Sequence, residues 1–170
     1  MKKLSFPTVK LGNFICEVKE KVKNSGISQD DFTVYGVTNT DGITVTNNKA
    51  SDDLGNYTVL RENQFAYNPY RVNVGSIGLS SPDTFGAVSP AYVVFETNGQ
   101  ISNEFLLYYL KSSLGINLIK WYGDRGGVRS ALRFSDLKEI VTFGDMNEDE
   151  ALRIAACLEE HFPHSKIGRA

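Results

Sequence analysis

The sequence predicts an α+β fold: a strand-rich body followed by a helix, a last strand and a short C-terminal helix. Three observations predict it. Through about residue 95, segments rich in Val, Tyr, Phe and Thr alternate with turns rich in Gly, Asn, Asp and Ser, as in a succession of short strands. From residue 104 onward the apolar residues take up helical spacing. The regular strand–helix alternation of a nucleotide-binding α/β fold does not occur.

The clearest strand is predicted at residues 32–38, which precede a turn signal at residues 39–42. Shorter strands are expected at residues 43–46 and 57–60, from residue 66 until Asn68 and Pro69 stop the strand, and at residues 72–79 and 91–96. Residues 13–23 are predicted to form a short helix, although β-branched side chains lower its propensity.

The helical segments come later in the chain. Residues 104–120 are predicted to be one helix, with Ser102 as its N-cap and Glu104 in its first turn. Residues 135–138 form a short turn or helical start, and residues 140–143 the last strand. A final helix is expected at residues 147–162, capped by Asn147. We therefore place one domain at residues 1–145 and a short helix with its tail at residues 146–170.

The composition is that of an ordinary globular protein. The chain has 170 residues, of which 41% are hydrophobic and 22% charged, and this suits a single domain. Cys16 and Cys157 form no metal-binding pattern, and two thiols without a disulfide framework suit a reducing, cytoplasmic location. We expect no signal peptide, because no apolar core follows the basic start, and no membrane span, because every apolar stretch is too short.

The net charge of −2 conceals an uneven distribution. Residues 105–138 hold six basic and two acidic residues, which gives +4, whereas residues 145–170 hold three basic and six acidic residues, which gives −3. A local basic excess is typical of surfaces that bind DNA phosphates. From charge alone, an ordinary solvated surface is the favoured interpretation.

No catalytic motif is found, so we expect no enzymatic activity and no cofactor. The two histidines, His161 and His164, have no plausible nucleophile beside them. Residues 75–78 lack the spacing of a nucleophile elbow, and residues 123–127 are not followed by the Lys of a P-loop. Residues 68–70 lack the second proline of an amino-methyltransferase motif.

An ordered set of segments carries a family resemblance. The set contains FAYNPYRVNVGSIGL at residues 65–79, GAVSPAYVVF at 86–95, EFLLYYLKS at 104–112 and VRSALRFSDL at 128–137, with residues 10–13 and 37–39 before them. In this order and spacing the segments resemble the target recognition domain of type I restriction–modification specificity subunits, over roughly residues 9–162.

The resemblance implies a non-catalytic, cytoplasmic bacterial protein that recognises one half of a split double-stranded DNA site. Such domains work with an adenine methyltransferase (modification) subunit, which binds S-adenosylmethionine, and with a separate nuclease subunit. S-adenosylmethionine is therefore expected only on the partner. Specificity subunits normally carry two recognition domains joined by long helices. This chain departs from that pattern, with one domain and one short candidate spacer helix.

Candidate DNA-binding residues lie in two kinds of segment. The less family-like stretch at residues 120–130 is expected to read bases, because arginine pairs bidentately with guanine and glycine permits close approach; its candidates are Trp121, Tyr122, Arg125, Gly126, Gly127 and Arg129. Residues 44–63 are a second such stretch. Arg71 and Arg133 lie in family-like segments and are expected to hold phosphates. The alternatives are a core position for Trp121, a plain turn at Gly126-Gly127 and a structural salt bridge for Arg71.

The predicted C-terminal helix supplies a second function class. Ala151, Ala155, Leu158 and Phe162 form an apolar stripe that either packs on its own domain or pairs two chains in a weak homodimer. The acidic tail and the short helix favour the alternative function of a protein-interaction module. Such a remnant or decoy would bind methyltransferase or specificity subunits without reading DNA.

Overall fold

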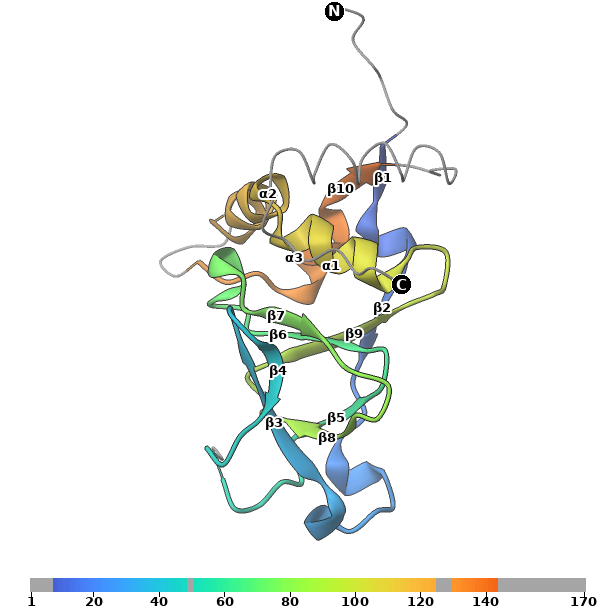
Figure 1. Ribbon diagram of the computed structural model, residues 1–170, viewed down its shortest axis with the longest axis vertical. Coiled ribbons are helices and arrows are strands. Elements are labelled where there is room, and N and C mark those ends of the chain that lie inside the picture. The colour runs from blue at the N-terminus through green and yellow to red at the C-terminus, as the bar shows by residue number, and fades with distance from the viewer. Residues whose placement is uncertain (1–7, 49–50, 125–129, 144–170) are drawn as a thin grey trace, which may run out of the picture. The chain divides into compact units, whose positions relative to one another are not determined.

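The computed structural model describes residues 8–48, 51–124 and 130–143 and confirms the α+β class (Figure 1). The chain forms two compact units: residues 10–140 are one, and residues 1–9 together with 141–170 are the other. The described residues of the second unit belong to a two-stranded sheet of β1 (Thr8–Lys10), whose last residue is counted with the larger unit, and β10 (Val141–Phe143). No helix within the described ranges is long and apolar enough to cross a membrane.

Two four-stranded sheets form the body of the larger unit. The first has the order β2-β9-β6-β7 and is antiparallel, with β2 at Ile15–Val18, β9 at Val93–Thr97, β6 at Phe65–Tyr67 and β7 at Ile77–Leu79. The second has the order β4-β3-β8-β5, with β4 at Gly42–Val45, β3 at Thr33–Thr38, β8 at Phe85–Val88 and β5 at Thr58–Arg61. β3 and β8 run parallel, and the other pairs of the second sheet are antiparallel.

Apolar side chains from both sheets share one core cluster. Val37, Leu60 and Val88 of the second sheet are buried with Ala66 and Val94 of the first. Alternate residues of a strand point to opposite faces, so the other side of β3 contributes to a separate buried cluster that includes Val34 and Val59. The first sheet also stacks aromatic rings, with the Phe65 and Phe95 centroids 4.7 Å apart and nearly parallel.

Close crossing of the sheets depends on one glycine of β7. A Cβ on Gly78 would lie 2.6 Å from the backbone nitrogen of Ile43 on β4, so no larger residue fits without a shift of the backbone. Gly78 is therefore a tight-packing position. Gly75 serves differently: it has a φ of +91° and ends a 3₁₀ turn, η4 (Val72–Val74).

Three helices follow the sheets: α1 (Asn103–Lys111), α2 (Ser113–Gly123) and α3 (Phe134–Glu139). The single helix expected at residues 104–120 is wrong, because the chain breaks at Ser112. The Ser112 hydroxyl donates to the Tyr109 carbonyl at 2.7 Å and accepts from the Gly115 amide at 3.1 Å, so it ends α1 and caps α2. A Cβ on Gly115 would lie 2.0 Å from the Tyr109 oxygen, which makes this tight junction specific for glycine.

Some of the other predicted elements are confirmed and others are wrong. The strand at residues 32–38 and the N-cap at Ser102 are confirmed, since the Ser102 hydroxyl accepts from the Phe105 amide. The helix at residues 13–23 is wrong: these residues hold part of η1 (Leu11–Asn13), β2 and part of η2 (Val22–Asn24), in keeping with their β-branched content. η3 (Gln29–Asp31) and β8 were not expected. The helix predicted at residues 147–162 lies outside the described residues.

Candidate nucleic-acid interface

The candidate interface begins at the turn between β6 and β7, which backbone hydrogen bonds fix. The Asn68 carboxamide accepts from the Tyr70 amide at 3.0 Å, and the Asn68 carbonyl accepts from Arg71 and Val72. This turn leaves Tyr70 59% exposed and Val74 54% exposed. Asn68 is thus a turn residue, and the turn presents an aromatic ring and a cation together on the surface.

Helix α2 packs against η4 and adds a second set of exposed side chains to this surface. Trp121 is 56% exposed, so the alternative of a core position for this residue is wrong. Its ring meets that of Tyr122 edge to face, with centroids 4.8 Å apart. Leu114 lies two helical turns earlier and is 49% exposed. The surface therefore combines apolar and basic side chains.

Two hydrogen bonds attach the segment after residue 130 to this turn and to the end of β6. The Leu132 amide donates to the Pro69 carbonyl at 3.0 Å, and the Tyr67 hydroxyl donates to the Leu132 carbonyl at 3.1 Å. Gly123 lies beside Ser130, since a Cβ on the glycine would be 3.4 Å from the Ser130 hydroxyl. The described ends on either side of residues 125–129 therefore lie together. The candidates Arg125, Gly126, Gly127 and Arg129 lie outside the described residues.

Arg133 follows this attachment directly and is exposed. Its backbone amide donates to the Asp136 carboxylate at 3.1 Å, which fixes the start of α3 and directs that carboxylate to the backbone. Among residues 8–48, 51–124 and 130–143, the guanidinium groups of Arg71 and Arg133 have no ion-pair or hydrogen-bond partner. The alternative of a structural salt bridge for Arg71 finds no partner in that part of the chain.

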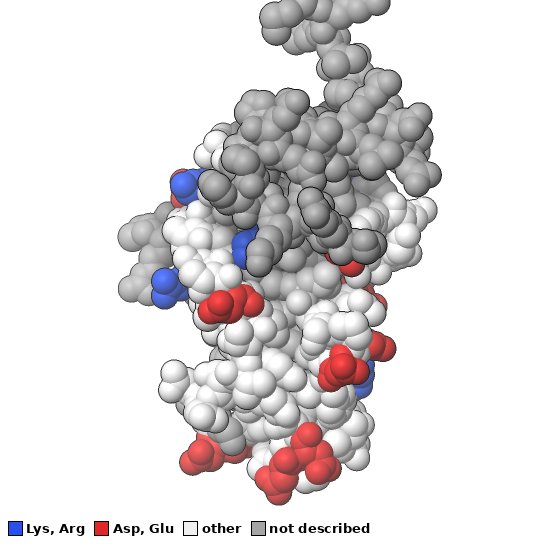
Figure 2. Space-filling view, in the orientation of Figure 1, with Lys and Arg blue, Asp and Glu red and all other residues white. Residues whose placement is uncertain are grey.

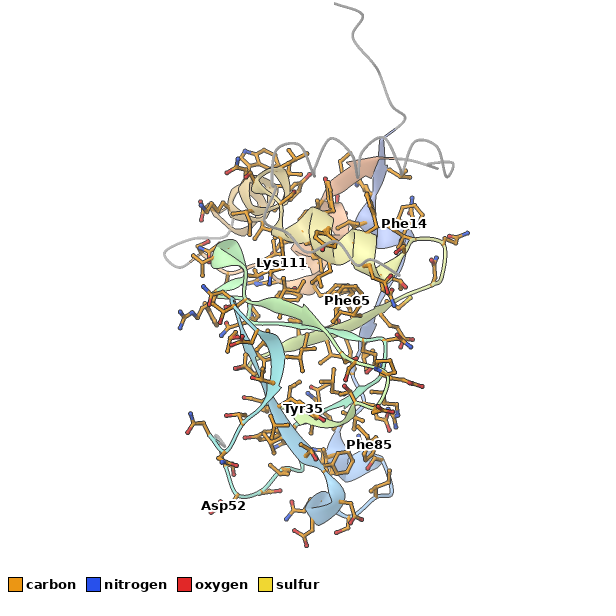
Figure 3. The ribbon with its side chains drawn as sticks, viewed as in Figure 1. Phe14, Tyr35, Asp52, Phe65, Phe85 and Lys111 are labelled. Atoms are coloured by element: carbon orange, nitrogen blue, oxygen red, sulfur yellow. The ribbon has the colours of Figure 1, made fainter. Side chains whose placement is uncertain are left out.

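Lys111 belongs to the same region and was not among the predicted site residues. Its ammonium donates to the Asn39 carbonyl at 3.2 Å, in the turn between β3 and β4, and its Cε lies near Gly75 (Figure 3). Burial lowers the pKa of Lys111, because desolvation disfavours the charged form. The signal available in the sequence was its membership of the basic segment 105–138.

The charged side chains are distributed unevenly over the surface. On the face shown in Figure 2, most Lys and Arg atoms lie around α2 and η4, with an acidic patch beside them, and Asp and Glu dominate near the N-terminal end of β3. The sequence agrees, since residues 14–64 hold eight acidic and five basic residues. In general, a basic surface attracts phosphates and an acidic surface repels them. In the described part of the chain, no cluster of three His, Cys, Asp or Glu side chains could hold a metal ion.

The chain has the fold of type I restriction–modification specificity subunits over 95% of its length. One similar structure comes from work on complex assembly and conformational transition of the type I restriction–modification system; it has a TM-score of 0.66 and 18% identity, and the match covers 44% of that chain. The HsdS subunit from Thermoanaerobacter tengcongensis has a TM-score of 0.63 and 17% identity, with 43% of its chain covered.

These identities show a shared fold. The chain spans less than half the length of the two structures, so its fold corresponds to about one half of each. No family model and no curated protein matches the sequence. The resemblance inferred from the ordered sequence segments is confirmed at the level of the fold.

Proposed function

We propose that this chain is a non-catalytic DNA recognition module that reads one half-site for a type I-like restriction–modification complex. One observation carries the proposal: Arg71, on the turn after β6, and Arg133, at the start of α3, are exposed on two segments that a hydrogen bond joins, and no described residue pairs with either guanidinium group. Unpaired guanidinium groups on a rigid surface suit phosphate binding. The fold shared with half of an HsdS subunit supports the same function.

The basic residues have different roles in this proposal. Arg71 and Arg133 hold phosphates, and Lys111 adds a third cation beside η4. Arg125 or Arg129 reads a guanine, helped by the close approach that Gly126 and Gly127 permit. Trp121 and Tyr122 supply apolar contact at the edge of the surface.

The partner we propose is an adenine methyltransferase subunit, which carries S-adenosylmethionine. A separate nuclease subunit completes the complex in this view. A weak homodimer through residues 147–162 would supply a second recognition domain, which would read the other half-site.

Competition binding with a series of variant DNA sites tests the proposal. Arg71→Ala and Arg133→Ala should weaken binding to all sequences alike and lower the salt slope by about one each. Arg125→Ala or Arg129→Ala should lose roughly 1–3 kcal/mol and relax preference at one position. Lys19→Ala is the matched control, because Lys19 is an exposed lysine on the loop after β2 that already pairs with Glu17 at 3.1 Å. Its salt slope should equal that of the wild type.

The alternative is a protein-interaction module that binds methyltransferase or specificity subunits without reading DNA. The exposed apolar side chains of Leu114, Val74 and Trp121 favour it, because such patches are frequent at protein interfaces. If none of the four arginine variants changes DNA binding in complex with a methyltransferase subunit, this alternative replaces the DNA reader. DNA methylation by the isolated chain with S-adenosylmethionine would contradict both.

A further inference from the structure

A cleft of about 450 Å³ lies in the larger unit where β3 extends beyond β8. β8 pairs with β3 only as far as Tyr35, opposite Val88, after which the chain leaves the sheet at Ser89. Gly36 to Thr38 consequently have β4 on one side and the cleft on the other. Gly36 contributes no side chain, which keeps the space open.

Three tyrosines contribute to the lining. Tyr57 is buried, and Tyr35 and Tyr92 are half-buried. Tyr35 is held in place because its ring packs on Gly86 of β8, where a Cβ would lie 2.5 Å from the ring. A preformed aromatic lining favours a flat ligand, since ring faces attract other rings.

The polar lining is uncharged and partly unsatisfied. Thr44 and Asn48 lie beside the tyrosines. Among the described residues, no hydrogen-bond partner meets the hydroxyls of Thr44, Tyr35 and Tyr92 or the Asn48 carboxamide. These groups are donors and acceptors directed to water or to a ligand.

The chemistry of the lining selects a class of ligand. None of the twelve lining residues carries a charge, so a phosphate or carboxylate would lose hydration without compensation. A wholly apolar ligand would leave the hydroxyls and the amide unpaired, which is also unfavourable. A neutral, planar ring with a hydrogen-bonding edge satisfies both constraints.

We propose that this cleft binds a single nucleobase that has been removed from the DNA stack. This identification of the ligand rests on the proposed function. Proteins that hold an extruded base pack it against aromatic side chains and hydrogen-bond its edge. Thr44 and Asn48 belong to residues 44–63, one of the two stretches expected to set specificity. The cleft therefore adds a base-selective position distinct from the Arg71 and Arg133 surface.

The experiment uses the full chain and two probes. The first is each free nucleoside, titrated while backbone amide resonances of residues 34–48 are followed by NMR. The second is a duplex with one mismatched base, compared with the fully paired duplex. An already unstacked base removes part of the extrusion penalty, so the mismatched duplex should bind about 3- to 10-fold more tightly.

Three variants make the test specific. Thr44→Trp fills the cleft with a residue that strands accept, and should abolish both the nucleoside shifts and the preference for the mismatch. Tyr35→Phe removes one hydroxyl without changing packing and should weaken nucleoside binding about 3- to 10-fold. Thr33→Trp is the control, because Thr33 is exposed on β3 but does not line the cleft.

The outcomes separate this inference from the function on which it rests. The cleft proposal is overturned if the chain binds duplex DNA without a preference for the mismatch, if Thr44→Trp leaves this binding unchanged, and if nucleosides cause no shifts. This outcome leaves the DNA reader intact. Nucleoside binding that Thr44→Trp abolishes, in a chain that binds no duplex, supports the cleft as a nucleobase site and overturns the DNA reader. Equal losses in Thr33→Trp and Thr44→Trp also overturn the cleft proposal.

Discussion

Removing one hydroxyl from Tyr67 tests how the segment after residue 130 is fixed to the sheet. Tyr67 is fully buried, and its hydroxyl donates to the Leu132 carbonyl at 3.1 Å. Burial raises the pKa of Tyr67, so the hydroxyl remains a protonated donor at neutral pH. Tyr67→Phe keeps the ring and its packing on Phe95 but leaves the Leu132 carbonyl without this donor.

The expected loss follows from burial. Leu132 is 1% exposed, so water does not readily replace the missing donor. Leaving a buried carbonyl unpaired should lower the free energy of unfolding by about 1–3 kcal/mol. Urea denaturation measures this loss, and faster hydrogen exchange of the Leu132 amide would show that the attachment to Pro69 loosens with it.

Tyr70→Phe is the matched control, because Tyr70 is 59% exposed and the structure gives its hydroxyl no partner among the described residues. That variant should change stability by less than about 0.5 kcal/mol. Equal stability of Tyr67→Phe and Tyr70→Phe would refute the argument that this hydrogen bond fixes the segment.

Two further predictions concern packing and pH. Gly78→Ala should destabilise the fold by about 1–3 kcal/mol or more, because its Cβ would meet the Ile43 backbone at 2.6 Å; Gly36→Ala, with 3.4 Å to the nearest atom, should be tolerated in a thermal melt. The hydrogen bond from Arg61 lowers the pKa of Glu20, so the pair contributes stability above the ordinary glutamate pKa of 4.5 and loses it as the pH falls through the lowered value. Both side chains are more than a third exposed, so the stability difference between wild type and Arg61→Met in urea should be below about 1 kcal/mol at pH 7 and vanish near pH 2; a difference that grows in acid would contradict the assignment.

The sequence was sufficient to predict those elements whose structure is decided by local signals. The strand at residues 32–38 and the Ser102 cap follow from residue types that act within a few positions. The break at Ser112 was missed because helical spacing continues across it. It depends on Ser112 and Gly115 meeting the Tyr109 carbonyl, a contact between two helices.

The candidate site shows the same division. Arg71 and Arg133 were identified from their segments, but their adjacency depends on the hydrogen bond from Leu132 to Pro69, which joins distant parts of the chain. The exposure of Trp121 could not be decided from the sequence, since a lone tryptophan on a helix gives no indication of which face is covered. Lys111 was missed because the carbonyl that it binds belongs to Asn39, in the turn between β3 and β4, and the sequence does not show that this turn lies near residue 111.

The long-range strand pairing has a consequence for how the chain folds. β3 and β4 can pair as soon as both are synthesised, but β8, the partner of β3 on its other side, comes some fifty residues later. In the first sheet, Ile15 of β2 pairs with Thr97 of β9, which is synthesised later still. The second sheet cannot be completed before β8 has left the ribosome, and the first cannot be completed before β9 has. Such non-local pairing predicts folding on the order of milliseconds to seconds. During synthesis the open edges of β3 and β2 are the places where two nascent chains would pair wrongly, so aggregation at high expression should begin there.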